Sequence, residues 1–415
     1  MRVLLLAGKG GAGTTTVAAA TALTAARAGI KTLLLSTETA SLHDVLGVLP
    51  GPLESAGRGA RPVLLEVESG LAVLQTDPAL PDGALHRDVG HVLDAAGVPG
   101  LPASDLLGLT GLTKLTSLCS LREQVAHGPW DLVVADVAGA ERALRLLSAP
   151  DDVVRALDRL APPQGRLGLA RLGLGALVGP SLARLRADLE GTRELLHAPT
   201  SSVRLVMAAE SAGLAWARRA FTSLVVQGFV VDGVVANRVL GPGADPTAWA
   251  SSRAAAQSGV LAQADEAFAP VAVQRLPDLP AAPVWPDAVA QLGAALMVGL
   301  AAEVGSSDPA AGLERLLVPP VGARQQVRRV ADGYELVIPA PLLSARDVQL
   351  TRDGDELRLG VQGAWWVLTL PAVLRRCIAV DAQLGGGGLV VRFRPDPALW
   401  PARPGAETSA AEGEP

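Results

Sequence analysis

A glycine-rich run near the start of the sequence has the residue types that bind phosphate groups. It stands between a short apolar stretch, Val3–Ala7, and a longer stretch with helical character, Val17–Ala28. Glycines let a backbone turn tightly and direct several N–H groups inward, and the start of the following helix adds a favourable dipole. We therefore predict a phosphate-binding loop rather than a simple strand-to-helix turn. It consists of Gly8, Lys9, Gly10, Gly11, Ala12, Gly13, Thr14, Thr15 and Thr16.

The predicted loop departs from the usual pattern at one position. That pattern is glycine, four residues, glycine, lysine and then serine or threonine. Thr14 occupies the lysine position, and Thr15 occupies the position whose hydroxyl normally reaches magnesium. Lys9 stands directly after the first glycine, in a chain whose other lysines are only Lys31 and Lys114. The sequence thus predicts a nucleotide-binding loop that lacks its usual cation and has another one close by.

Two polar residues stand at the ends of predicted strands. Asp136 follows the apolar run Leu132–Ala135, and Asn237 follows Val230–Ala236. A Mg²⁺ ion that bridges phosphates must contact both the hydroxyl side and a strand-end carboxylate, so we expect Thr15 and Asp136 to converge. The amide of Asn237 offers a donor and an acceptor together, as purine recognition requires. A lone asparagine can equally be a turn residue.

Short apolar runs alternate with longer helical stretches through the first three-quarters of the chain, which is typical of βαβ units. We predict a doubly wound α/β domain with a mainly parallel sheet over residues 1–303. Leu-, Ala- and Gly-rich stretches near 85–126 and 149–199 exceed what a crossover requires, so they predict helical insertions above the sheet. The expected strands are Val3–Ala7, Thr32–Leu35, Leu71–Gln75, Leu132–Ala135, Val203–Met207, Val230–Ala236 and Val271–Gln274.

The last quarter of the chain has a different pattern. A Gly/Ser/Asp/Pro segment predicts a linker over 304–317. Short alternating runs with turn signals then predict a small all-β sandwich over 318–397. The tail, 398–415, is rich in Ala, Glu, Gly and Pro and has little apolar area to bury, so we expect it to be disordered.

Composition excludes several classes of protein. The net charge is −5, with 36 basic and 41 acidic residues spread along the chain, which argues against nucleic-acid binding. No apolar run reaches the ~18–20 residues that cross a bilayer, and the first apolar stretch is too short for a secretory signal. We expect no integral membrane segment and a cytoplasmic location. Cys119 and Cys377 are far apart, and the spacing of His86 and His91 does not suit a shared metal ion.

The loop with Lys9 and the run that ends in Asp136 resemble those of the arsenite-pump and tail-anchored-protein targeting ATPases, in the signature-lysine class of P-loop proteins. Segments 36–47, 203–210 and 234–240 are similar to that family in order and spacing. The resemblance implies ATP and Mg²⁺ as ligands, with Asp136 holding a magnesium-bound water and Asn237 at the adenine edge. It implies a homodimer, in which Lys9 reaches the partner's nucleotide. The β-rich end resembles the crystallin-like, small-heat-shock-protein-type domain of one branch.

The sequence departs from the family in its catalytic segments. Glu38 stands where the family has the aspartate that orients the attacking water, although Glu38 could equally be an ordinary strand-end acid or helix cap. Gly139–Arg142 replaces the family's Pro-Thr-Gly-His segment, and Trp216 stands where a second glutamate is expected. The cysteines that would bind arsenite, or clamp zinc at a dimer interface, are missing. We therefore disfavour arsenite transport and a zinc-bridged dimer.

Two functions follow from these features. The first is a dimeric, nucleotide-switched binder of hydrophobic client proteins with slow ATP hydrolysis, for which 101–121 and 167–182 would supply an apolar groove unless they are simply core. The second is a hydrolysis-deficient scaffold or regulator that acts through its β-sandwich. A partitioning ATPase of the same class is a weaker third candidate, because such proteins lack an appended sandwich.

Overall fold

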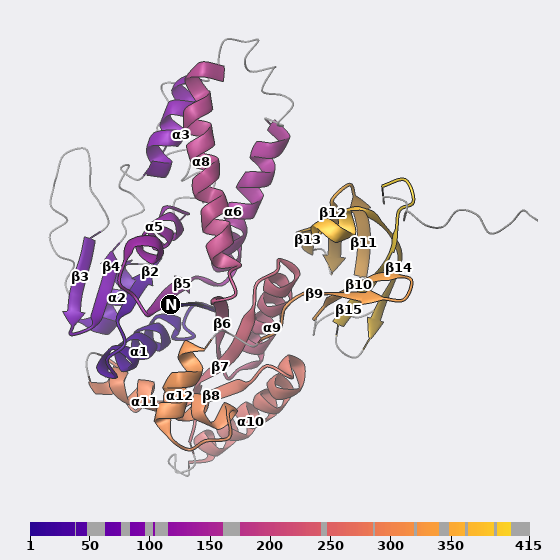
Figure 1. Ribbon diagram of the computed structural model, residues 1–415. Coiled ribbons are helices and arrows are strands. Elements are labelled where there is room, and N and C mark those ends of the chain that lie inside the picture. Colours follow the sequence, from indigo (N-terminus) through magenta and orange to yellow (C-terminus); the bar gives the residue numbers. More distant parts are fainter. Residues whose placement is uncertain are drawn as a thin grey trace, which may run out of the picture. The chain divides into compact units, whose positions relative to one another are not determined.

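The computed structural model divides the chain into two compact units, Met1–Leu224 with Phe229–Ala323, and Val225–Gly228 with Arg324–Pro415 (Figure 1). The residues that the structure describes are 1–37, 39–47, 63–75, 84–95, 103, 115–160, 175–241, 247–284, 287–318, 322–339, 348–361, 364–385 and 388–399.

The first unit is built on an eight-stranded sheet in the order β3-β4-β2-β5-β1-β6-β7-β8. Every neighbouring pair is parallel except β3 and β4. The predicted α/β fold with a mainly parallel sheet is confirmed. The strands are β1 (Arg2–Gly8), β2 (Thr32–Ser36), β3 (Val63–Glu68), β4 (Leu71–Gln75), β5 (Leu132–Ala138), β6 (Ser201–Ala208), β7 (Val231–Val239) and β8 (Val273–Pro277).

Both faces of the central strands are buried, which explains why these strands are continuous apolar runs. Along β1, Leu4 and Leu6 belong to a core cluster with α1 (Thr14–Arg27) and α11 (Asp287–Glu303). Val3 and Leu5 point to the other face and are just as buried. The sheet is therefore held rigidly between helices, and its strand ends are fixed in position.

A second group of helices extends from the sheet. These are α3 (Ala84–Ala95), α5 (Leu115–His127), α6 (Ala140–Leu160) and α8 (Gly175–Leu196). α3, α5 and α6 each pack on α8, and Figure 1 shows α3, α8 and α6 side by side. Arg184 of α8 pairs with Asp88 of α3 at 3.0 Å, and Arg122 of α5 pairs with Asp188 of α8 at 2.6 Å. Much of the predicted groove, 101–114 apart from 103 and 167–174, lies outside the described residues.

The segment predicted as a linker contains a helix. α12 (Pro309–Leu317) begins after Asp308, whose side chain accepts a hydrogen bond from the backbone N of Ala310 at 2.9 Å. Pro309 therefore lies in the first turn of a helix, where its missing N–H is not needed. A Cβ on Gly312 would lie 2.0 Å from the carbonyl oxygen of Met297, so α12 packs closely on α11 in the first unit. The remaining helices are α2 (Thr39–Leu46), α9 (Ser211–Val226), α10 (Ala248–Phe268) and α13 (Ala372–Arg375).

The second unit consists of two antiparallel sheets in the orders β14-β15-β10-β9 and β11-β12-β13. Their inward side chains, including Leu336, Leu359, Val391 and Phe393, are almost fully buried. None of these strands joins the eight-stranded sheet, so the predicted all-β C-terminal part is confirmed. The strands are β9 (Gln326–Val330), β10 (Gly333–Ile338), β11 (Val348–Asp353), β12 (Glu356–Val361), β13 (Ala364–Thr369), β14 (Cys377–Gly385) and β15 (Gly388–Pro395).

A buried ion cluster joins β1, β6 and β7 away from the loop end of the sheet. The carboxylate of Asp232 is fully buried and lies 3.0 Å from guanidinium nitrogens of both Arg2 and Arg204. Burial alone would raise the pKa of Asp232, but the charges of Arg204 and Arg2 and their hydrogen bonds hold it below the usual 3.8. Each charge in this cluster depends on the others, because water cannot replace a lost partner.

Replacing Asp232 should therefore destabilise the first unit strongly. Asp232→Asn leaves two guanidiniums buried without their carboxylate, and we expect it to lower the free energy of unfolding by about 3–5 kcal/mol in urea titrations at pH 7. The control is Asp152→Asn, which removes the partner of Arg155 on an exposed helix surface and should cost less than about 0.5 kcal/mol. The contribution of Asp232 should persist above pH 3.8 and disappear only as the pH falls through its lower folded-state pKa. Equal effects of the two variants would contradict this interpretation.

Candidate nucleotide-binding site

The predicted phosphate loop connects β1 to α1 with the backbone turns that it requires. Gly11 and Gly13 have φ values of 81° and 85°, in the left-handed region that favours glycine. α1 begins at Thr14 without a side-chain cap on its first turn and without an acidic residue there. N–H groups at a helix start that has no capping side chain form a favourable position for an anion.

Thr15 and Asp136 lie together beside this loop. The Oγ1 of Thr15 donates a hydrogen bond of 2.7 Å to the Oδ2 of Asp136, and the Oγ of Ser36 donates one of 3.0 Å to the same oxygen. The backbone N of Thr37 also donates to the carbonyl oxygen of Asp136 at 3.0 Å. Asp136 is fully buried. A hydroxyl and a carboxylate thus meet where Mg²⁺ would sit, and their role as its ligands stays a prediction.

Thr14 does not provide the positive charge that a lysine would have at its position. It is 6% exposed, and a Cβ on Gly8 would lie only 2.0 Å from its Oγ1 and 2.8 Å from the carbonyl oxygen of Val206. The Thr14 side chain therefore occupies the space beside the first glycine of the loop. Any side chain at position 8 would displace it.

Lys9 is exposed and lines a cavity on the outer side of the loop. The other walls are Gly10–Ala12, residues 208–210, Ala212 and Gly213 at the start of α9, and Arg238, Arg253 and Gln257. Within the described part of the chain, Lys9 has no ion pair. Its trans-acting role stays a prediction. Glu38, the other residue predicted to act in catalysis, lies outside the described residues.

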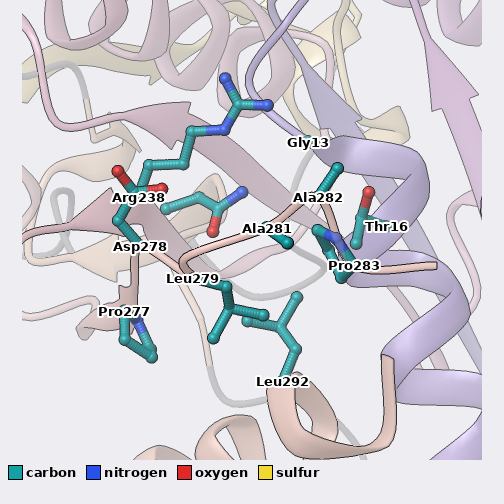
Figure 2. A pocket seen from close by; sticks show the side chains of 11 residues that line it. Gly13, Thr16, Arg238, Pro277, Asp278, Leu279, Ala281, Ala282, Pro283 and Leu292 are labelled. Carbon is teal, nitrogen blue, oxygen red and sulfur yellow. The ribbon is translucent and has the colours of Figure 1, made fainter. Parts of the chain in front are cut away.

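Asn237 supports the loop directly. Its Nδ2 donates a hydrogen bond of 2.8 Å to the carbonyl oxygen of Ala12, and a Cβ on Gly13 would lie 2.4 Å from the same nitrogen. Asn237 also lines a second cavity, with Gly13 and Thr16 on one side and Pro277–Leu279 and Ala281–Pro283 on the other (Figure 2). This cavity passes from the loop toward an apolar wall, as a nucleotide site would. Reading of a purine by Asn237 stays a prediction.

The sequence did not identify two residues that shape this site. Gln257 of α10 donates from Nε2 to the carbonyl oxygen of Arg238 at 2.8 Å, and its Oε1 accepts from the backbone N of Leu240 at 2.9 Å. Arg238 has a φ of 58° and lines both cavities. The position of Arg238 next to Asn237 was the only signal available, because a left-handed arginine has no sequence signature.

The fold and the loop together define the class of protein. A mainly parallel sheet with a glycine-rich loop between β1 and α1, and a buried carboxylate near the end of β5, is the architecture of a P-loop ATPase-like domain. The model of the family described as anion-transporting ATPase matches residues 1–297, and a model of the HSP20-like domain found in ArsA matches residues 331–393. The chain belongs to the anion-transporting ATPase family.

Relatives match over nearly the whole chain. An uncharacterized protein of Streptomyces coelicolor is 36% identical and covers 97% of this chain and 99% of its own length. Protein Rv2184c of Mycobacterium tuberculosis is 32% identical over 96% of this chain and 97% of its own length. A protein of Chlorobaculum tepidum named "Putative arsenical pump-driving ATPase" is 27% identical over 95% of this chain and 96% of its own length. The similarity to these relatives therefore extends over both parts of the chain.

In the part of the chain that the structure describes, no helix has the length and apolar character to cross a membrane.

The hydrogen bond between Thr15 and Asp136 makes a specific prediction about metal-dependent binding. Thr15→Ala removes the hydroxyl, and we expect it to weaken binding of ATP with Mg²⁺ by roughly tenfold or more, since one good polar contact contributes about 1–2 kcal/mol. Thr15→Ser keeps the hydroxyl and should stay within about threefold of the original protein. Calorimetric titration with and without Mg²⁺ measures both. An equal loss for the two variants, or a loss for Thr15→Ala that does not depend on Mg²⁺, would contradict a metal-side role for Thr15.

Proposed function

We propose that this protein is a dimeric ATP-binding switch that binds hydrophobic client proteins and hydrolyses ATP slowly. The observation that carries this proposal is the contact of 2.7 Å between Thr15 and Asp136 beside the loop at the start of α1. A hydroxyl, a buried strand-end carboxylate and the N–H groups of a helix start are the groups that hold a phosphate chain with Mg²⁺. Thr15 and Asp136 would hold the metal ion, and the ion would neutralise phosphate charge.

The rate of hydrolysis follows from the missing loop lysine. A preorganised donor aimed at developing charge typically contributes ~10²–10³ to the rate of the chemical step. Thr14 has no charge and packs beside Gly8, so its side chain cannot supply this term. We infer slow turnover with binding retained, because the backbone of the loop and the metal side do not depend on residue 14.

Dimerisation and client binding are the parts of the proposal that rest on the family. Lys9 is exposed on the loop and has no ion pair within the described residues, which suits a contact with the nucleotide of a partner subunit. The helices α3, α5, α6 and α8 form a layer of their own that nucleotide-dependent closure could move. Hydrophobic proteins would bind to that layer.

A second candidate function is a nucleotide-binding scaffold without turnover, which acts through the C-terminal β unit. The burial of Thr14 against Gly8 favours it, because the loop is closed around a threonine and not around a cation. Gly139, with a φ of 101°, and the start of α6 at Ala140 stand where the family has its γ-phosphate sensor segment, which also favours it.

Restoring the lysine separates the two functions. Thr14→Lys should leave ATP binding in place and raise the hydrolysis rate at least tenfold if Glu38 is competent, because it returns a charged donor to the phosphate chain. Steady-state phosphate release measures the rate, and Thr14→Met is the control for side-chain length without charge. Fast hydrolysis by the original protein, abolished by Glu38→Gln, would show that the loop is altered but not impaired. No gain from Thr14→Lys would favour the scaffold.

The dimer is tested by sedimentation. With a non-hydrolysable ATP analogue and Mg²⁺, we expect the sedimentation coefficient to shift from monomer to dimer, and we expect Lys9→Ala to weaken that shift by roughly tenfold in dissociation constant, since a charge-assisted contact to phosphate is lost. Lys31→Ala, at the exposed residue just before β2, is the matched control. A monomer that responds neither to the nucleotide nor to Lys9→Ala would discard the trans-acting lysine.

A further inference from the structure

The geometry points to Arg238 as the cation that serves the phosphate chain of the bound nucleotide in place of the missing loop lysine. This inference rests on the proposed nucleotide site and assigns to it a residue from the end of β7, outside the loop. The ligand class is a nucleoside polyphosphate, and Arg238 would act in the same subunit that holds the nucleotide.

Arg238 is held in an unfavourable backbone conformation. Its φ of 58° lies in the left-handed region, and among the residues that the structure describes it is the only non-glycine residue with a positive φ. A bulky side chain is disfavoured there, and such residues concentrate at functional sites where the surrounding structure enforces them. A glycine or asparagine at this position would relieve the strain.

Contacts on both sides of Arg238 hold its backbone in this conformation. The Gln257 side chain binds the carbonyl oxygen of Arg238 and the backbone N of Leu240, at 2.8 and 2.9 Å. On the other side, Asn237 is fixed to the loop through its bond to Ala12. Gln257 is itself buried, and both the nitrogen and the oxygen of its amide bind this turn. The backbone of Arg238 is thus locked at a fixed distance from the loop.

The side chain that this backbone presents is available for a ligand. Arg238 is exposed, and its guanidinium forms no ion pair or hydrogen bond within the described part of the chain. It lines the cavity that contains Gly13 and Thr16 and also the cavity that contains Lys9–Ala12, so it lies along the loop on both sides. In Figure 2 the side chain of Arg238 extends toward the end of the cavity where Gly13 lies, and away from Pro277 and Leu279.

The other nearby arginine is less suitable. Arg253 lies 3.5 Å from the carboxylate of Glu210 and 5.6 Å from the ring centroid of Trp249, so its charge already has partners. Arg253 also lines only the outer cavity. A guanidinium matches phosphate oxygens with two parallel donors and keeps its charge at every physiological pH. Arg238 therefore has the charge, the free donors and the fixed backbone that phosphate binding requires.

The test compares ATP binding and thermal stability in the full-length protein. We expect Arg238→Ala to weaken binding of ATP with Mg²⁺ at least tenfold by calorimetry, and Arg238→Lys to weaken it by about threefold, because lysine keeps the charge but loses the paired donors. The salt dependence of ATP binding should become shallower in Arg238→Ala, since a charged contact is lost. Arg219→Ala, at an exposed arginine of α9, should change neither quantity.

Arg238→Gly separates contact from backbone strain. It should lose as much ATP affinity as Arg238→Ala, yet its thermal unfolding midpoint should rise by roughly 1–3 °C because glycine accepts a left-handed φ. If Arg238→Ala and Arg238→Gly bind ATP within twofold of the original protein, this inference is wrong while the nucleotide site stands. If the original protein binds no ATP, the proposed function fails first. A lower midpoint with unchanged affinity would show that Arg238 is retained for the fold.

Discussion

The site depends on a carboxylate that has no access to water. Asp136 is fully buried, and a charge in such a position is tolerated only with hydrogen-bond partners. Thr15 from the start of α1 and Ser36 from the end of β2 both donate to its Oδ2. These two bonds connect the loop helix, β2 and β5 at one point. The parallel sheet makes this meeting unavoidable, because Ser36 and Asp136 are paired in register at the same edge.

The buried carboxylate of Asp232 differs from that of Asp136, because its partners are charged groups and not hydroxyls. There, one buried carboxylate pairs with the buried guanidiniums of Arg2 and Arg204, and Arg2 also donates hydrogen bonds to Thr200 and Ser202. At the loop, hydroxyls face the carboxylate and the nearby cations, Lys9 and Arg238, are exposed. The first cluster places its charges in direct contact with one another, whereas the second has exposed positive charge that an external anion can reach.

The central strands could be predicted because strands that are buried on both faces consist of continuous apolar runs. The loop was predicted from its glycines and its place between an apolar strand and a helix, and its meeting with Asp136 from the need of a bridging Mg²⁺ ion for both a hydroxyl and a carboxylate. Two strands at sheet edges were missed. β3 pairs only with β4 and leaves Leu64 46% exposed. β9 is exposed along its whole length, so its sequence has no clear apolar pattern. α12 was missed because Pro309 reads as a helix breaker, while at a first turn it is harmless. Gln257 and Arg238 could not be found, since hydrogen bonds between residues that are distant in the sequence leave no local pattern.

Where a cation stands decides what it can do for a bound nucleotide. A lysine rooted in the loop follows the phosphate chain into the transition state and so accelerates its cleavage. Arg238 is rooted at the end of β7, outside the loop, where Gln257 and the neighbouring Asn237 hold its backbone. A cation that contacts the phosphate chain equally in the ground state and the transition state tightens binding without raising turnover. Exchanging Thr14 for lysine and Arg238 for a neutral side chain would therefore move the same binding energy from holding ATP to hydrolysing it.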